Sequence, residues 1–559
     1  MLFYQLRSMQ RPDATLDFVS DIARLWHNIK KLRLCLQVYP KSGKLTNIVR
    51  KHKFRVIQFM RYFWLLIFSL LLLAIALAIV ACTPAEPAPI DPLTPYYPAF
   101  HKESLPADFD FDRTPHYDLT FTIDPETRLI KGVQRVHFRN LSGVVMRDVY
   151  LRLYPNLPQL GGLMKVTSVR TLPDRYAVGF APDMQNTAVR ITLINELQSD
   201  QDLDLEVEFE VLAPKKSGYV LFGESEGILS LPYAYPMLAR QTGDPAHPWR
   251  LEIPPTFADI AITNLAFYSV TATLPADYTI VTAGVEITQT QSAASQWIDH
   301  YMVTGPAREW TMLVSKNLHK LSQSVDGNQI NNYYLTKDAN TGKSAMAYSA
   351  AVMRVYDRLF SPYVFTQLDV TEAPTRYLGM EYPKLNYIGQ DVYRDVANSQ
   401  EILIAHEISH QWWYALVGSD PYKYPWLDEG LAEHSSLLYM ETIYGEEVAD
   451  RIRSHRWRIP VKWVQDHGYD APVGQEVTAF NGTNYEILVY AKSALFFDGL
   501  YQKMGRERYL EVLQTFIDRY RFKTPKPEDF LDTVREVGGI DPMPLYKKWI
   551  ESTGSISGD

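Results

Sequence analysis

Cysteine is scarce in this chain. Its 559 residues include two cysteines, Cys35 and Cys82, and no cysteine follows position 82. Two cysteines exclude a disulfide framework, although a single Cys35–Cys82 bridge stays open. The long segment after Cys82 also offers no thiolate to a metal ion, so histidines and carboxylates have to form any metal site there.

Positive charge is scarce beyond the first 81 residues. Residues 1–81 carry 13 Lys and Arg against 3 Asp and Glu, whereas the rest of the chain carries 43 against 61. Nucleic-acid binding needs clustered Lys and Arg, so this acidic body excludes a nucleic-acid partner. The apolar fraction of 46% and the charged fraction of 21% are those of a globular protein, and the length implies two or more domains.

Long hydrophobic runs are absent except near the N-terminus. Residues 62–81 are twenty uncharged, mostly apolar residues, which is long enough to cross a bilayer as a helix. The run ends in Ile79-Val80-Ala81-Cys82, which resembles a bacterial lipobox, where cleavage before the cysteine leaves a lipid on its sulfur. An uncleaved membrane anchor is the alternative. Under either reading the body is expected outside the cytoplasm, tethered to a membrane.

Composition and apolar periodicity predict five segments. Residues 1–59 are a basic extension or a mis-assigned start, because Met60 directly precedes Arg61. Residues 60–81 are the signal peptide or transmembrane segment, and the Pro-rich residues 82–112 are an extended tether. Apolar and polar residues alternate at several places between 113 and 320, which predicts a β-rich domain such as a sandwich. The strands are expected at 117–123, 132–138, 203–211, 268–274 and 310–314.

The last segment, residues 321–559, changes to helical periodicity. Its expected helices are 344–360, 399–417, 428–444, 491–504, 529–537 and 543–551, with a short extended stretch at 366–372. The predicted fold is therefore multidomain, with a membrane segment, a β-rich domain and an α+β domain that ends in helices.

The most specific pattern is H-E-x-x-H at residues 406–410. Four residues apart on a helix, His406 and His410 lie on one face and can share a metal ion, and Glu407 can point toward a water on that ion. A catalytic zinc needs a third protein ligand. Trp413 and Leu416 occupy the positions where a metzincin continues with Gly and His, so that ligand has to come from elsewhere.

Glu429 is the candidate for the third ligand. It follows His410 after eighteen intervening residues, and a loop at 418–425 allows its helix to fold back against the first one. A His-His-Glu set with an open position is the hydrolytic zinc arrangement, with one zinc ion per chain. Glu433, one turn later, either accepts a hydrogen bond from a ligand histidine or belongs to a solvated helix face. Trp412 and Trp413 are expected to pack in the core.

These motifs resemble the gluzincin zinc aminopeptidases typified by aminopeptidase N, a family that also contains the leukotriene-epoxide hydrolase. H-E-I-S-H-Q-W-W, followed by W-L-D-E-G, carries the resemblance. Gly379-Met380-Glu381 resembles the family's exopeptidase motif, and the segment from Val489 to Ala494 resembles its V-Y-x-K-G-A segment. The resemblance extends over residues 115–550 and implies a saddle-like β-rich domain followed by a thermolysin-like domain.

The resemblance also implies roles for single residues. Glu381, with Gly379 and Met380, binds the free α-amine of a peptide, and Tyr490 stabilises the oxyanion. Tyr485 is expected in the same cleft. The chain departs from the family's pattern at three positions, Tyr382 for Asn, Asp428 for Asn and Ser493 for Gly.

The predicted function is a membrane-tethered zinc aminopeptidase that acts on peptides with a free N-terminus, with Glu407 as the general base. Two alternatives stay open. The same scaffold can hydrolyse a non-peptide substrate such as an epoxide, or it can serve as an inactive binding protein. The presence of His406, Glu407, His410, Glu429 and Tyr490 favours an active enzyme.

Overall fold

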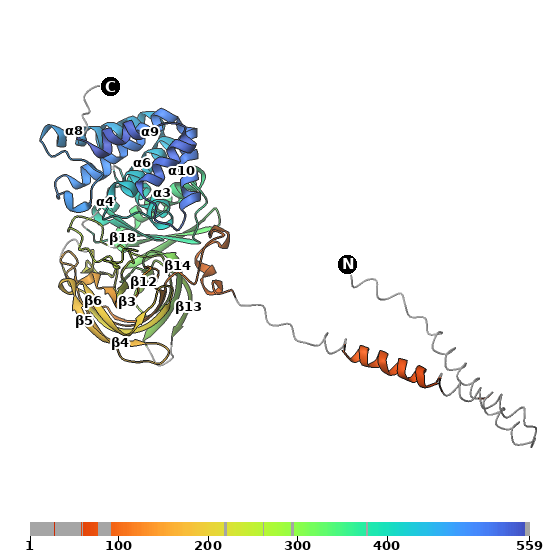
Figure 1. Ribbon diagram of the computed structural model, residues 1–559. Coiled ribbons are helices and arrows are strands. Elements are labelled where there is room, and N and C mark those ends of the chain that lie inside the picture. Colours follow the sequence, from red (N-terminus) through yellow and green to blue (C-terminus); the bar gives the residue numbers. More distant parts are fainter. Residues whose placement is uncertain are drawn as a thin grey trace, which may run out of the picture. The chain divides into compact units, whose positions relative to one another are not determined.

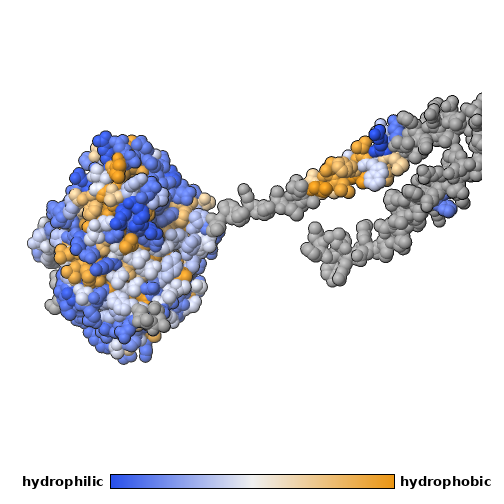
Figure 2. All heavy atoms as spheres, turned by 90° about the horizontal axis from the view of Figure 1, so that it is seen from below, coloured by the Kyte–Doolittle hydropathy of each residue, from blue (hydrophilic) through white to orange (hydrophobic). Residues whose placement is uncertain are grey.

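A computed structural model describes residues 27, 58, 60–76, 91–216, 221–260, 262–291, 296–375, 378–397 and 399–553. The chain divides into two compact units, Met1–Ile90 and Asp91–Asp559. In the first unit residues 60–76 form a helix whose apolar side chains are exposed (Figures 1 and 2). Across the described ranges, no helix combines the length and the hydropathy that a membrane span requires. Cys35 and Cys82 lie outside the described residues.

The first part of unit Asp91–Asp559 is β-rich, as predicted. A seven-stranded sheet has the order β13-β14-β11-β1-β2-β7-β4, and two four-stranded sheets have the orders β10-β3-β6-β5 and β12-β15-β9-β8. Buried residues from the three sheets share one hydrophobic core. The strands are β1 (His116–Asp124), β2 (Leu129–Arg139), β3 (Met146–Arg152), β4 (Leu163–Thr171), β5 (Gly179–Asp183), β6 (Ala188–Leu197), β7 (Asp202–Leu212), β8 (Gly223–Ser225), β9 (Ile228–Ser230), β10 (Met237–Leu238), β11 (Ala266–Pro275), β12 (Thr279–Thr282), β13 (Val285–Gln291), β14 (Trp297–Ala307) and β15 (Met312–Ser315).

The second part begins with a mixed five-stranded sheet and continues in helices. The sheet order is β16-β17-β18-β20-β19, so β19 is an edge strand. Within this unit the helices gather at the end opposite the β-rich sheets, with β18 between them (Figure 1). The elements are β16 (Leu318–Val325), β17 (Asn328–Leu335), α3 (Ala339–Leu359), β18 (Gln367–Ala373), β19 (Gly379–Tyr382), β20 (Leu385–Gly389), α4 (Gln390–Arg394), α5 (Gln400–Ser409), α6 (Pro425–Tyr444), α7 (Glu446–Ile452), α8 (Ile459–Asp466), α9 (Ser493–Met504), α10 (Arg506–Tyr520), α11 (Pro527–Thr533) and α12 (Met543–Tyr546).

The predicted tether at residues 82–112 is wrong for its second half. Thr94–Ala99 form the short 3₁₀ helix η1, and the side chains of Tyr96 and Phe100 are buried. Phe100 forms a β-bridge with Phe365, and the ring of Phe109 packs edge-on against Phe522. Proline predicts an extended chain, but the aromatic residues between the prolines bury enough apolar surface to fold the segment onto the domain.

The predicted domain boundary between residues 320 and 321 falls inside β16. Because β16 pairs along its length with β17, the five-stranded sheet begins at Leu318. The helix expected over 399–417 is also too long. Regular α-helix ends at Ser409, and the distorted turn η6 (Gln411–Leu416) follows. Tertiary contacts override the helical pattern there, since the Tyr414 carbonyl accepts a hydrogen bond from Arg308 Nε at 2.7 Å.

Candidate metal centre

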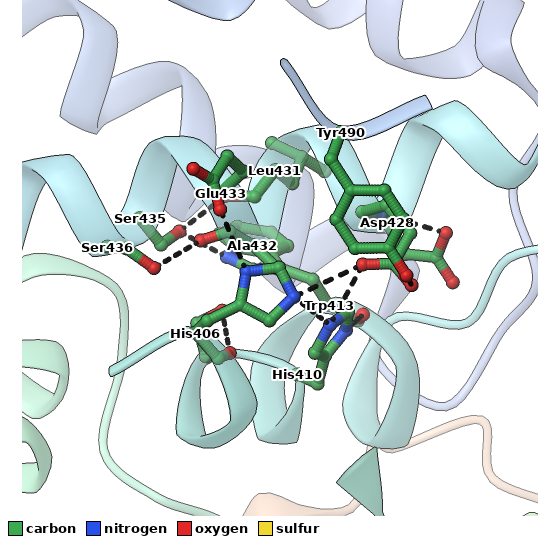
Figure 3. A network of polar contacts seen from close by, with 12 residues as sticks. His406, His410, Trp413, Asp428, Leu431, Ala432, Glu433, Ser435, Ser436 and Tyr490 are labelled. Atoms are coloured by element: carbon green, nitrogen blue, oxygen red, sulfur yellow. Dashed lines mark hydrogen bonds and ion pairs between the residues drawn. The ribbon is translucent and has the colours of Figure 1, made fainter. Parts of the chain in front are cut away.

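The side chains of His406, His410 and Glu429 converge on one point. The two Nε2 atoms lie 3.2 Å apart, and Glu429 Oε2 lies 3.2 Å from His406 Nε2 and 3.4 Å from His410 Nε2. Both imidazoles point from α5 toward α6, where Glu429 is located (Figure 3). All three side chains are buried. The predicted folding back of the second helix therefore does deliver Glu429 to the histidine pair.

The separations match a tetrahedral zinc site. Zn²⁺ binds His nitrogen and carboxylate oxygen at about 2.0–2.2 Å, and tetrahedral geometry then places neighbouring ligand atoms about 3.3 Å apart. The observed separations of 3.2–3.4 Å fit that arrangement. Two imidazole nitrogens and one carboxylate also form the donor set of hydrolytic zinc sites. Among the described residues these three are the group of His, Cys, Asp and Glu side chains suited to hold a metal ion.

Each imidazole is oriented through its other nitrogen. His410 Nδ1 lies 3.1 Å from the carbonyl oxygen of Trp413, within the distorted turn after α5. His406 Nδ1 lies 3.3 Å from Glu433 Oε2. Both contacts favour a proton on Nδ1, which leaves each Nε2 lone pair free for a cation. Glu433 thus faces the ligand His406 and not solvent.

Glu433 is itself held by two side chains that the sequence analysis missed. Arg456 Nε and Nη2 donate to its two oxygens at 2.8 and 3.0 Å, and Trp457 Nε1 donates at 2.8 Å. Burial alone would raise the pKa of Glu433, but Arg456 and His406 together lower it well below its ordinary value. Arg456 and Trp457 belong to the turn η7 (Arg453–Arg458), which carries no recognisable motif.

We expect Glu433→Gln to weaken zinc binding about 10- to 100-fold, because partners that orient a metal-bound histidine contribute that much to affinity. Competition with a fluorescent zinc chelator measures this loss. The matched control is Glu447→Gln, at an exposed carboxylate on α7. Equal zinc affinity in wild type and Glu433→Gln would contradict the orienting role.

Glu407 lies beside the cluster of His406, His410 and Glu429 and against strand β19. A Cβ at Gly379 would overlap the Glu407 carboxylate, so a glycine is required there. Glu407 Oε2 is buried and accepts no hydrogen bond among the described residues. Burial raises the pKa of Glu407 to about 8; the nearby Glu381 also raises it, whereas His406 opposes the shift. Such a carboxylate is basic enough to accept a proton from water near neutral pH.

Tyr490 and Glu381 border the same centre. The Tyr490 hydroxyl donates to Glu429 Oε1 at 2.7 Å, and its ring stacks on His406 with 5.8 Å between centroids (Figure 3). Glu381 is on the edge strand β19, and within the described ranges no other side chain hydrogen-bonds to it. Burial raises its pKa. Tyr382, which replaces the family's usual Asn, is buried and packs edge-on against Tyr233 and Tyr387.

One cavity of about 450 Å³ is lined by the three clustered side chains and by Glu407, Glu381 and Tyr490. Phe257 and Asp259 of the β-rich part also line it, as do Tyr485 and Arg456 of the helical part. Tyr485 was expected in this cleft. Asp259 escaped the sequence analysis because it lies between strands in an irregular segment without periodicity. Trp412 and Trp413 are buried in the core, as predicted, and do not line the cavity.

Part of the chain that carries this cluster matches a known protein family. A model of the peptidase family M1 domain matches residues 345–549. Residues 345–549 belong to peptidase family M1. The gluzincin resemblance is therefore confirmed, and residues 345–549 contain the cluster of His406, His410 and Glu429 as well as Glu381, Glu407 and Tyr490.

The chain is also similar in sequence to named relatives and in fold to solved structures. The chain is 24% identical over 253 residues to aminopeptidase M1-D of Oryza sativa subsp. japonica and 26% identical over 226 residues to leukotriene A-4 hydrolase of Xenopus laevis. These alignments cover 41% and 36% of this chain, and they span 28% and 35% of the relatives' own lengths. The M1 zinc metallopeptidase from Deinococcus radiodurans has a similar fold, with a TM-score of 0.59 and 17% identity, over 79% of this chain and 95% of that one.

Proposed function

We propose that this protein is a zinc aminopeptidase. The observation that carries the proposal is the convergence of His406, His410 and Glu429 next to a buried, unpartnered Glu407 oxygen. His406, His410 and Glu429 would hold the zinc ion, which supplies a bound water of lowered pKa and polarises a carbonyl oxygen.

Three other residues transfer the proton, stabilise the developing charge and bind the substrate's amine. Glu407 accepts a proton from the attacking water at its free carboxylate oxygen and passes it to the leaving amine. The Tyr490 hydroxyl, now directed at Glu429, lies close enough to donate to a carbonyl oxygen that gains negative charge. Glu381 pairs with the substrate's α-ammonium group, and that ion pair sets the bond to be cleaved one residue from the N-terminus.

Peptides are the proposed substrates. A solved structure of the Deinococcus radiodurans M1 zinc metallopeptidase is described as bound to a Tyr-Ser-Ala substrate, and its fold covers 80% of this chain with a TM-score of 0.58. A cavity of about 450 Å³ has room for a few residues of a peptide.

A panel of aminoacyl arylamides, each with a free or an acetylated amine, tests the proposal. We expect hydrolysis of the free-amine compounds by zinc-loaded protein, and loss of that hydrolysis after chelation. Hydrolysis that persists in the chelated protein would contradict the proposal.

Glu381→Gln distinguishes an aminopeptidase from a peptidase that does not require a free N-terminal amine. The substitution keeps the side-chain volume but removes the charge that attracts the α-ammonium group. A hydrogen bond between charged groups contributes about 1.5–3 kcal/mol to binding. We expect kcat/KM for free-amine substrates to fall about 10- to 100-fold. Residual hydrolysis of acetylated substrates should change little. An equal loss for both substrate sets would instead assign Glu381 a structural role.

We further propose that the protein is tethered to a membrane outside the cytoplasm. The support is in the sequence, where an apolar run ends in Ile79-Val80-Ala81-Cys82. Metabolic labelling with a palmitate analogue in a bacterial host, with wild type and Cys82→Ser compared, tests this. We expect label on the wild type alone, and label on neither protein would remove the support for lipidation.

A further inference from the structure

The cavity around the metal centre holds, in one part, two acids without a cationic partner among the described residues and, in another part, an arginine. These acids are Asp259 and Glu381, which also line a small pocket that adjoins this cavity. His406, Glu433 and Arg456 do not line that pocket, so the two acids lie on the side of the cavity away from Arg456.

Arg456 lies in the other part of the cavity. It is the one lysine or arginine that lines the cavity in the part of the chain that the structure describes. It reaches the metal centre through Glu433 and then His406, which lies one helical turn before His410 on α5. Two acids without a described cationic partner thus lie where an N-terminal amine is expected, whereas the arginine, paired with Glu433, lies elsewhere on the cavity wall, which also includes Glu486.

Arg456 has a donor nitrogen, Nη1, from which no described residue accepts a hydrogen bond. Its Nε and Nη2 bind Glu433, but no hydrogen bond from its Nη1 is present among the described residues. The side chain is 40% exposed, and Nη1 is its terminal nitrogen without a hydrogen-bond acceptor among the described residues. A guanidinium group binds carboxylates in preference to neutral amides, because charge-assisted hydrogen bonds are stronger.

A second cavity, of about 320 Å³, shares Arg456 with the first. Its other walls are largely apolar, with Ile402, Met440, Val448 and Ile452. Its remaining charged groups are already engaged. Glu401 accepts hydrogen bonds from Tyr439 and Tyr444, and Arg451 pairs with Glu447. This cavity can take an apolar side chain, while Arg456 at its border takes an anion.

We propose that Arg456 binds the C-terminal carboxylate of the substrate, so that the enzyme prefers dipeptides and tripeptides. This inference rests on the proposed aminopeptidase function and names the substrate class of the same site. From the outer nitrogen of His406, one contact of 3.3 Å leads to Glu433 and another of 2.8–3.0 Å leads to Arg456. Extended chain spans roughly 3.3–3.6 Å per residue, so one or two residues beyond the cleaved bond bring the carboxylate to Arg456.

The test compares three peptides on the zinc-loaded full chain: a tripeptide with a free carboxylate, its C-terminal amide and a hexapeptide that begins with the same three residues. We expect the wild type to favour the free tripeptide over its amide about 10-fold in kcat/KM, with the hexapeptide as slow as the amide. Arg456→Gln should bring the ratio of acid to amide close to 1, and Arg456→Lys should keep part of it.

The ratio of kcat/KM for the free tripeptide to that for its amide distinguishes loss of carboxylate binding from loss of zinc. If loss of Arg456 disturbs Glu433 and lowers zinc occupancy, both rates fall together and their ratio stays unchanged. Arg458→Gln is the matched control, because Arg458 is an exposed arginine of the same turn that lines neither cavity; it should keep the wild-type ratio.

Two results overturn the inference while leaving the proposed function intact. One is equal hydrolysis of acid and amide by the wild type, and the other is an unchanged preference in Arg456→Gln. If zinc-loaded wild type hydrolyses none of the three peptides, the proposed function itself fails and this inference falls with it.

Discussion

Glu407→Gln is expected to lower kcat for a free-amine substrate by about 10²- to 10⁴-fold while zinc stays bound. General acid–base catalysis contributes a factor of that size, and an amide cannot accept the proton of the attacking water. Glu407 is not part of the converging group that would hold the ion, so its substitution leaves the three ligands in place. Stopped-time assays of arylamide hydrolysis, with zinc content measured on the same preparation, give both quantities.

The local structure makes Glu407→Gln a clean test. The Glu407 side chain lies against Gly379, where no side chain can shift to fill its place, and glutamine has nearly the same volume. Glu447→Gln, on the exposed face of α7, should behave as wild type. Activity of Glu407→Gln within about threefold of wild type would contradict the assignment of the general base.

His410→Ala is expected to abolish both stoichiometric zinc binding and activity. His410 supplies one of the three converging atoms, and a catalytic zinc site with two protein ligands loses most of its affinity. The substitution also removes a buried side chain whose Nδ1 contacts the Trp413 carbonyl, so we expect a lowered melting temperature as well. Zinc content after dialysis and kcat/KM are the two measurements.

His247→Ala is the matched control for His410→Ala, because His247 is an exposed histidine of the β-rich part. Circular dichroism separates loss of zinc from loss of fold. A folded His410→Ala protein that retains one tightly bound zinc ion and normal turnover would remove His410 from the metal site.

Periodicity predicted the fold well where each element is amphipathic. The alternation from Leu203 to Val211 predicted β7, and the helical spacing from Ser344 to Phe360 predicted α3. It failed where tertiary contacts decide the backbone. The turn after Ser409 leaves the helical path because Tyr414 is held by Arg308 and Glu309 of the β-rich part, and no local pattern contains that information.

The same distinction applies to the site. His406, His410 and Glu429 were found because their spacing along two helices is itself the signal, and the structure brings them together. Their roles, and those of Glu381 and Tyr490, stay predictions. Asp259 and Arg456 were missed because neither belongs to a motif; each reaches the cavity only through the packing of segments that are distant in sequence. Residues 91–112 were misread because proline content dominated their pattern, while the side chains of Tyr96 and Phe100 are buried and those of Phe109 and Phe111 are half-buried.

Titration of metal-free protein with zinc, with hydrolysis of a free-amine aminoacyl arylamide recorded at each addition, tests the central claim most directly. His406, His410 and Glu429 form one cluster, so activity should rise linearly and stop at one equivalent of zinc per chain. Full zinc binding with no gain in activity, or activity already present in the metal-free protein, would contradict the account.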